Sequence, residues 1–175
     1  MTNIKKDFIM PLVVLSAICL LISGALAITN SVTEPIITQA AAERARDAMM
    51  RILPDAAGFE PLEAEGLPRS VTSVYGTTND VGFIFMVSVN GYGGEMRLIC
   101  GIDPQGRIIM TETLSHTETA GIADPVFNMQ HRYVGLDSNL EGIDAISGAT
   151  ITFNAYRNGI QDAFIAFEIV RGLTD

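Results

Sequence analysis

Cysteine and histidine are scarce in this sequence, with two of each among 175 residues, and tryptophan is absent. Cys19 lies inside an apolar N-terminal run and Cys100 lies far along the segment that follows, so the two thiols are not expected to meet. A disulfide framework and a cysteine-based zinc site are therefore excluded. The methionines are not spaced as a copper site and are expected to fill the core. We expect no bound metal, and a domain that folds on its hydrophobic core.

Positive charge is also scarce, because lysine occurs only at Lys5 and Lys6 and the formal net charge is −9. Residues 1–30 carry two lysines and one aspartate, which leaves a net charge of −10 on residues 31–175. A domain this acidic is repelled by phosphate backbones and by anionic lipid head groups. Nucleic acid is not an expected partner.

Two patterns of catalytic proteins are missing. No Gly-x-Gly-x-x-Gly segment stands between a strand and a helix, so the chain is not expected to bind NAD by itself. No Ser/His/Asp arrangement can be supported either. We expect a chain that takes part in a reaction without being a catalyst on its own.

One long apolar run is present, over residues 8–28, and it contains no charged side chain. At about 1.5 Å per residue, a helix of this length crosses a hydrocarbon core of about 30 Å. Lys5 and Lys6 precede the run, and the positive-inside rule then predicts a cytoplasmic N-terminus. The rest of the chain is expected outside the cytoplasm, in a periplasm or at the cell surface.

The N-terminus has two other interpretations. A cleaved signal peptide is favoured by the small residues Ala25–Ala27, but the apolar run is longer than the usual hydrophobic region of such peptides. A type IV pilin-like leader is disfavoured by Asp7 and Leu12, where such leaders carry Gly and Glu. We therefore predict an uncleaved single-pass anchor over residues 1–30.

The segment after the anchor has a helical pattern. Thr33 is a plausible N-cap before Pro35, and Pro54 is expected to end the helix. Residues 31–54 are predicted to form a juxtamembrane helix or stalk, and a helix packed into the core is the open alternative.

Residues 55–175 are predicted to form an α+β domain with an antiparallel sheet and packed helices. Residues 55–70 are rich in Pro, Gly and acids and indicate a loop. Four β-rich runs, 70–78, 81–89, 95–103 and 107–115, indicate strands, and the last two indicate a hairpin around Pro104–Gly106. Residues 116–137 suggest irregular chain with one short helix, and apolar spacing predicts a final helix over about 152–172.

The segment DAISGAT, residues 144–150, stands directly before that final helix. A helix N-terminus presents unpaired N–H groups and a partial positive charge, which suits a phosphate. Gly148 and Ala149 allow a bulky group to approach, and Thr150 offers a hydroxyl that could be esterified. The alternative is that Ser147, Thr150 or Thr152 only caps the helix.

The residues Asp144, Ser147, Gly148, Ala149 and Thr150 match the pattern Asp-x-x-Ser/Thr-Gly-Ala-Thr. This pattern resembles the flavin-transferase recognition site of FMN-binding domains in the family of the Rnf G subunit, which is related to the C subunit of Na⁺-translocating NADH:quinone reductase. The resemblance implies that Thr150 carries FMN through a phosphoester, and that a flavin transferase attaches it.

Two further segments resemble the same family. The stretch SHTETAGI is similar to His-x-Glu-Thr-Pro-Gly-Leu, with Ala120 in place of Pro and Ile122 in place of Leu. NGYGG and the following hairpin resemble the family's Gly-Tyr-x-Gly segment. The likeness implies further cofactor-binding residues, which are Tyr92, His116, Glu118, Thr119, Gly121, Ile122 and Thr152. Taken alone, His116 and Glu118 are more often structural residues.

The resemblance implies an electron-transfer subunit of an Rnf-type complex, which moves electrons between ferredoxin and NAD⁺ and couples this to ion translocation. Other membrane subunits of the complex are the expected partners. Two alternatives stay open. One is a stand-alone membrane-anchored flavodomain that passes electrons to another reductase, and the other is a binding or assembly module without flavin.

Overall fold

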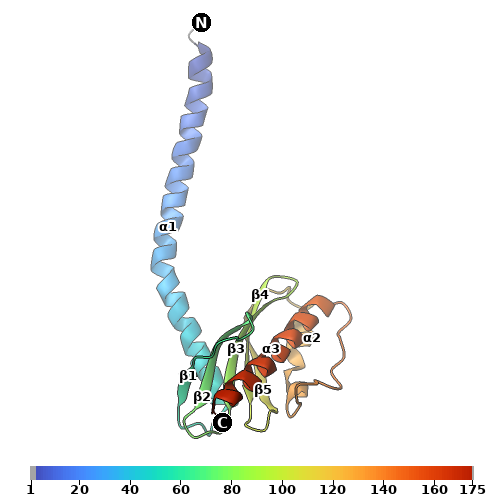
Figure 1. Ribbon diagram of the computed structural model, residues 1–175. Coiled ribbons are helices and arrows are strands. Elements are labelled where there is room, and N and C mark those ends of the chain that lie inside the picture. Colours follow the sequence, from blue (N-terminus) through green and yellow to red (C-terminus); the bar gives the residue numbers. More distant parts are fainter. Residues whose placement is uncertain (1–2, 175) are drawn as a thin grey trace. The chain divides into compact units, whose positions relative to one another are not determined.

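The computed structural model describes residues 3–174, which form one long helix, a five-stranded sheet and three further helical segments (Figure 1). The elements are α1 (Asn3–Ile52), β1 (Phe59–Leu62), β2 (Val71–Thr77), β3 (Phe83–Asn90), β4 (Glu95–Ile102), β5 (Ile108–His116), α2 (Asp124–Asn128), the 3-10 helix η1 (Gln130–Tyr133) and α3 (Thr150–Thr174). The chain divides between Glu43 and Arg44 into two compact units, and α1 continues across this boundary. The α+β class predicted from the sequence is confirmed.

The first unit is the larger part of α1. Its apolar side chains between residues 9 and 28 are exposed, as a segment surrounded by lipid requires. Within the described residues, the stretch Ile9–Ile52 is the one helix long and apolar enough to cross a membrane.

The predicted helix start at Thr33 is wrong, because α1 runs without a break through Pro35. Proline removes one N–H donor, but helix-forming residues on both sides continue the hydrogen-bond ladder. Three hydroxyls turn back onto carbonyls one turn earlier instead of capping a new helix. These bonds are Thr29 Oγ1 to Ala25 O, Ser31 Oγ to Ala27 O, and Thr38 Oγ1 to Glu34 O, each at 2.9 Å.

The second unit is built on an antiparallel sheet in the order β1-β2-β3-β4-β5, so each strand pairs with its neighbour in the sequence. The four predicted strands are confirmed as β2 to β5. Strand β1 lies in the segment predicted as loop, and its four residues include Pro61. Proline is tolerated there because β1 is an edge strand and its outer side needs no ladder hydrogen bond.

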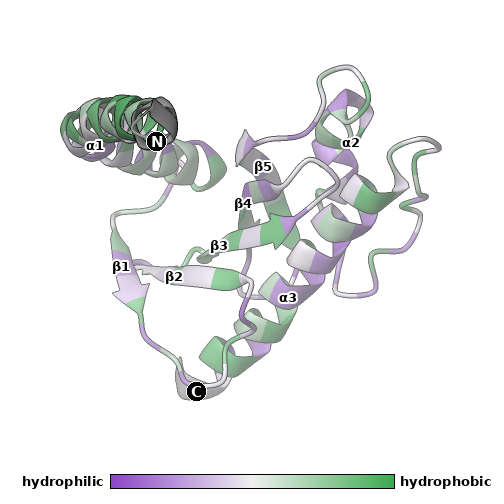
Figure 2. Cartoon of the chain, turned by 90° about the horizontal axis from the view of Figure 1, so that it is seen from above, coloured by the Kyte–Doolittle hydropathy of each residue, from purple (hydrophilic) through white to green (hydrophobic). Residues whose placement is uncertain are grey.

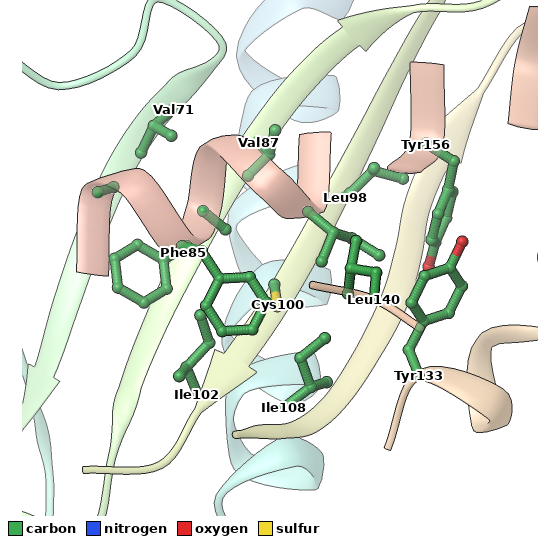
Figure 3. Packing of buried hydrophobic residues seen from close by; sticks show 14 of the residues in the cluster. Val71, Phe85, Val87, Leu98, Cys100, Ile102, Ile108, Tyr133, Leu140 and Tyr156 are labelled. Carbon is green, nitrogen blue, oxygen red and sulfur yellow. The ribbon is translucent and has the colours of Figure 1, made fainter. Parts of the chain in front are cut away.

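Helix α3 covers one face of the sheet and forms the main core with it (Figure 2). Alternate residues of β3 and β4 point to this face, so that Phe85, Leu98 and Cys100 are buried beneath the helix (Figure 3). At Gly159 an added Cβ would lie 3.1 Å from Val89 Cγ1. Glycine at this position therefore allows α3 to lie close against the sheet.

The last turns of α1 cover the other face of the sheet. Ala48, Met49 and Ile52 are buried there against Ile84 and Ile99. A Cβ on Gly101, in β4, would approach Ile52 Cγ2 to 2.2 Å, which only glycine avoids. The sequence left open that this segment forms a helix packed into the core. That interpretation holds for the end of α1, because α1 from Arg44 onward belongs to the second unit.

Two buried tyrosines, Tyr133 in η1 and Tyr156 in α3, differ in their hydrogen bonding. Tyr156 Oη lies 2.9 Å from Thr111 Oγ1. Tyr133 is completely buried, and its Oη has no hydrogen-bond partner within the described residues. We expect Tyr156→Phe to lower the free energy of unfolding by about 1–2 kcal/mol, because Thr111 loses its partner. Tyr133→Phe is expected to be neutral or stabilising. Urea denaturation of both variants measures the difference, and an equal loss in the two would contradict the assignment.

Alkaline pH is expected to weaken the second unit through Tyr133. Burial raises the pKa of this tyrosine from 10.0 to about 12. The folded state therefore holds a proton that the unfolded state releases, and the resulting stability is lost as pH rises through this window. The free energy of unfolding should fall by at most about 1.4 kcal/mol per pH unit for this group. Tyr133→Phe should flatten that slope in denaturation curves, and an unchanged slope would exclude Tyr133 as its source.

Candidate functional site

A pocket of about 420 Å³ lies where the β3–β4 turn, the loop after β5 and the first turn of α3 meet. This volume is within the range of small-molecule and cofactor sites, about 300–1,000 Å³. The pocket is lined by Tyr92, Glu118, Thr119, Ile122, Gly148, Ala149, Thr150, Ile151 and Thr152. The segments NGYGG, SHTETAGI and DAISGAT lie far apart in the sequence, and each was predicted to contribute to a flavin site. The fold brings residues of all three to this pocket.

The wall from α3 places an exposed hydroxyl at the pocket. Gly148 has a left-handed φ of 86°, which glycine adopts without strain, and Ala149 is buried immediately before the helix. The helix then begins at Thr150, which is exposed. The unpaired N–H groups and the partial positive charge of the helix N-terminus stand beside this hydroxyl.

The predicted alternative of a side-chain cap is not found for either threonine. Thr150 Oγ1 donates to the carbonyl of Ile146 at 3.4 Å, and Thr152 Oγ1 donates to Glu118 at 2.8 Å. A capping side chain would accept a hydrogen bond from a backbone N–H of the first turn. Both hydroxyls are instead donors to groups outside the helix, and within the described residues no backbone N–H donates to the side chain of Ser147, Thr150 or Thr152.

Glu118 is the buried carboxylate of the pocket, with 9% of its surface exposed. Its Oε1 accepts a hydrogen bond from the backbone N–H of Gly93 at 3.0 Å, and its Oε2 accepts the bond from Thr152. Gly93 belongs to the β3–β4 turn and Thr152 to α3. The carboxylate therefore links two walls of the pocket, and the hydrogen bonds offset the cost of burying its charge.

The glycines of the β3–β4 turn are required by this close approach. A Cβ on Gly91 would lie 2.0 Å from Glu118 Oε1, and one on Gly93 would lie 2.5 Å from Thr117 O. Thr117 Oγ1 also donates to Gly93 O at 3.0 Å. Between the two glycines, Tyr92 projects with 75% of its surface exposed.

Exposed apolar side chains gather at the pocket. Tyr92, Ile122 and Ile151 are each more than half exposed although all three are large and apolar or aromatic. Such side chains supply the apolar walls that a planar ring system needs. Ile151 was not predicted from the sequence as a pocket residue. Its position directly after Thr150, outside the apolar face of the final helix, is the signal that could have identified it.

Four of the predicted residues do not line the pocket. Asp144 and Ser147 are exposed in the segment before α3. Gly121 has a φ of 83°, and its N–H donates to Asp124 Oδ2 at 3.0 Å. His116 ends β5, where its ring stacks on Phe127 with centroids 4.3 Å apart. That contact agrees with a structural role for this histidine.

No cluster of three or more potential metal ligands occurs within residues 3–174. The pocket instead fits a phosphorylated flavin, because apolar walls, close glycines, a helix N-terminus and an exposed hydroxyl meet in it.

Comparison with known proteins agrees with this geometry. Residues 91–165 match the family described as the FMN-binding domain. The chain is 31% identical over 172 residues to the G subunit of the ion-translocating oxidoreductase complex of Methanosarcina acetivorans, covering 89% of this chain and 90% of that protein. It is 28% identical over 192 residues to the protein of the same name from Shewanella piezotolerans, covering 93% and 91%. It is 30% identical over 165 residues to the G subunit of the Na⁺-translocating ferredoxin:NAD⁺ oxidoreductase complex of Acetobacterium woodii, covering 78% and 80%.

The fold and the site thus define a membrane-associated protein with an FMN-binding domain. The chain belongs to the family of G subunits of ion-translocating oxidoreductase complexes. The predicted Rnf-type family, the FMN cofactor and the role as an electron-transfer subunit of such a complex are thereby confirmed.

Proposed function

We propose that this subunit carries its FMN covalently, through a phosphoester between the flavin phosphate and Thr150 Oγ1. The observation that supports the proposal most directly is the exposed Thr150 hydroxyl at the pocket, beside the N-terminus of α3. That end of the helix favours a bound phosphate through its N–H groups and its dipole. Gly148 leaves the approach open, since nothing lies within 4 Å of a Cβ added there.

We propose that the donor is an activated flavin phosphate, a phosphoanhydride such as a flavin dinucleotide. Thr150 Oγ1 bonds to the flavin phosphorus, the phosphoanhydride bond breaks, a nucleoside monophosphate leaves, and a base of the transferase takes the hydroxyl proton. An unactivated hydroxyl in an exposed position is a weak nucleophile, since the described residues place only the Ile146 carbonyl against it. A separate flavin transferase is therefore proposed to catalyse the step. We propose that it recognises the exposed residues Asp144, Ser147 and Gly148, together with the buried Ala149.

The residues of the pocket then have separate tasks. Tyr92, Ile122 and Ile151 are proposed to exclude water from the flavin rings, and Thr119 is proposed to bind a polar edge of the flavin. FMN supplies the ability to accept and release electrons, and the protein supplies orientation and electrostatics. We propose that His116 and Gly121 support this loop from outside the pocket.

The electrons are proposed to pass between ferredoxin and NAD⁺ through the other membrane subunits of an Rnf-type complex. The relative from Acetobacterium woodii is named for that reaction and for Na⁺ translocation. The relative from Clostridium ljungdahlii is named for the same electron reaction with proton translocation. In this chain the exposed apolar part of α1 is proposed to pack against partner helices in the membrane.

The proposed topology places residues 1–30 as the cytoplasmic N-terminus and membrane anchor, 31–54 as the juxtamembrane helix and 55–175 as the FMN-binding domain outside the cytoplasm. Lys5 and Lys6 support this orientation by the positive-inside rule. A single-pass protein with this topology lies in the cell membrane, and its domain faces the periplasm where one exists.

Separation of the protein under denaturing conditions tests the proposal. Protein from its own host is boiled in detergent, run on a gel and examined for flavin fluorescence. A covalent flavin stays on the protein band, and a band without fluorescence would contradict the ester. Deletion of the gene should abolish ferredoxin-dependent NAD⁺ reduction by membranes, whereas full activity would favour a stand-alone flavodomain.

A further inference from the structure

We propose that Glu118 is a positioning residue, which holds the β3–β4 turn and α3 at a fixed separation across the FMN pocket through Gly93 and Thr152. The inference rests on the proposed function, because it concerns where the flavin on Thr150 lies. Glu118 acts through these two residues and not by binding the flavin itself.

The argument begins with the two oxygens of the carboxylate. Oε1 is bonded to the N–H of Gly93 and Oε2 to the hydroxyl of Thr152, at 3.0 and 2.8 Å. The residue is almost completely buried and forms no ion pair in the described part of the chain. A buried carboxylate that loses one of two charge-assisted hydrogen bonds must find water or another donor. Loss of the hydrogen bond from Gly93 or from Thr152 would therefore leave one buried carboxylate oxygen without a donor.

The β3–β4 turn leaves Glu118 little freedom. The space beside Gly91 is filled by Glu118 Oε1, and the space beside Gly93 by the backbone of Thr117 and Glu118. Gly93 is bonded on both sides, since its N–H meets Glu118 and its carbonyl accepts from Thr117 Oγ1. These contacts fix the turn to Glu118, and the hydrogen bond from Thr152 to Oε2 then joins the turn and Glu118 to α3.

The separation of the walls decides where a tethered flavin lies. Thr150 and Thr152 belong to the same turn of α3, so the tether and the Glu118 contact are fixed to each other. Tyr92 stands between the two glycines on the opposite wall. The bonds of Glu118 thus set the distance from the proposed tether to Tyr92, the side chain proposed to cover the flavin rings.

The test replaces Thr152 by valine, which has the same shape but cannot donate a hydrogen bond. In full-length protein from the native host, Thr152→Val should keep the FMN adduct. Flavin fluorescence should rise about twofold or more, because Tyr92 contacts and quenches the rings less. The redox potential of the flavin should shift as well. Thr152→Ser should restore both values, and fluorescence and potential equal to wild type in Thr152→Val would overturn the proposal.

Thr111→Val is the matched control, because it also removes a buried hydroxyl hydrogen bond, the one to Tyr156. It should lower stability by a similar amount and leave the flavin fluorescence unchanged. A purely structural role for Thr152 predicts the same behaviour in both valine variants.

Amide exchange tests the same contact without any flavin. In protein made without a flavin transferase, the Gly93 amide should exchange roughly tenfold faster in Glu118→Ala and Thr152→Val than in wild type. Unchanged exchange would overturn the proposal even where a variant fails to acquire flavin. Wild-type protein without an adduct on Thr150 would refute the covalent flavin, and the exchange measurement would still decide the role of Glu118.

Discussion

The Thr150→Ala variant is expected to carry no covalent flavin and to leave the complex unable to pass electrons through this subunit. Ferredoxin-dependent NAD⁺ reduction by membranes should fall by roughly tenfold or more, because FMN supplies the redox chemistry here. The fold should survive, since Thr150 is exposed and its hydrogen bond to Ile146 is long at 3.4 Å. The free energy of unfolding should change by no more than about 0.5 kcal/mol.

Thr150→Ser is the control for this variant, because it keeps a hydroxyl at the first position of α3. We expect it to retain at least part of the flavin and of the activity. A Thr150→Ala protein that still fluoresces on a denaturing gel would place the flavin on another residue. A flavin-free variant with full membrane activity would show that the electron path does not use this cofactor.

Truncation of Phe167 is expected to have the largest effect on stability. This ring of α3 is completely buried against the sheet and meets Phe83 and Phe85 edge to face, with centroids 5.7 and 6.5 Å apart. Phe167→Ala should lower the free energy of unfolding by about 3–5 kcal/mol, as core phenylalanine deletions do. That loss is a large share of the about 5–15 kcal/mol typical of whole domains. Urea denaturation followed by circular dichroism measures it.

Ile165→Ala is the matched control on the same helix, because Ile165 is 52% exposed. It should change stability by less than about 0.5 kcal/mol. Phe167→Ala should also reduce the yield of flavin-loaded protein, because α3 carries both Thr150 and Thr152. A loss below about 1 kcal/mol in Phe167→Ala would contradict the packing of α3 against the sheet.

The strands and the final helix could be predicted because their periodicity follows directly from burial on one face. Phe153, Tyr156, Ile160 and Phe167 recur at helical spacing, and all are buried against the sheet. Strand β1 could not be predicted, since Pro61 argues against a strand and only the pairing with β2 overrides it. The helix start at Thr33 failed for a related reason, because proline usually marks a helix boundary, whereas α1 continues through Pro35.

The pocket could be predicted only through the family resemblance. No spacing in the sequence brings Tyr92, Glu118 and Thr150 together, because their proximity depends on the sheet and on how α3 packs over it. The partners of Glu118 show the same limit. Its bonds to Gly93 and Thr152 span 25 and 34 residues of sequence, so only the tertiary structure reveals them.

The central claim, a covalent FMN on Thr150, is tested most directly by the intact mass of the protein purified from its own host, with peptide mapping of residues 144–160. We predict an increase of about 440 Da located on Thr150, as expected for an esterified flavin phosphate. An unmodified Thr150 in a host with an active flavin transferase would contradict the account. The motif would then be only the chain that leads into α3.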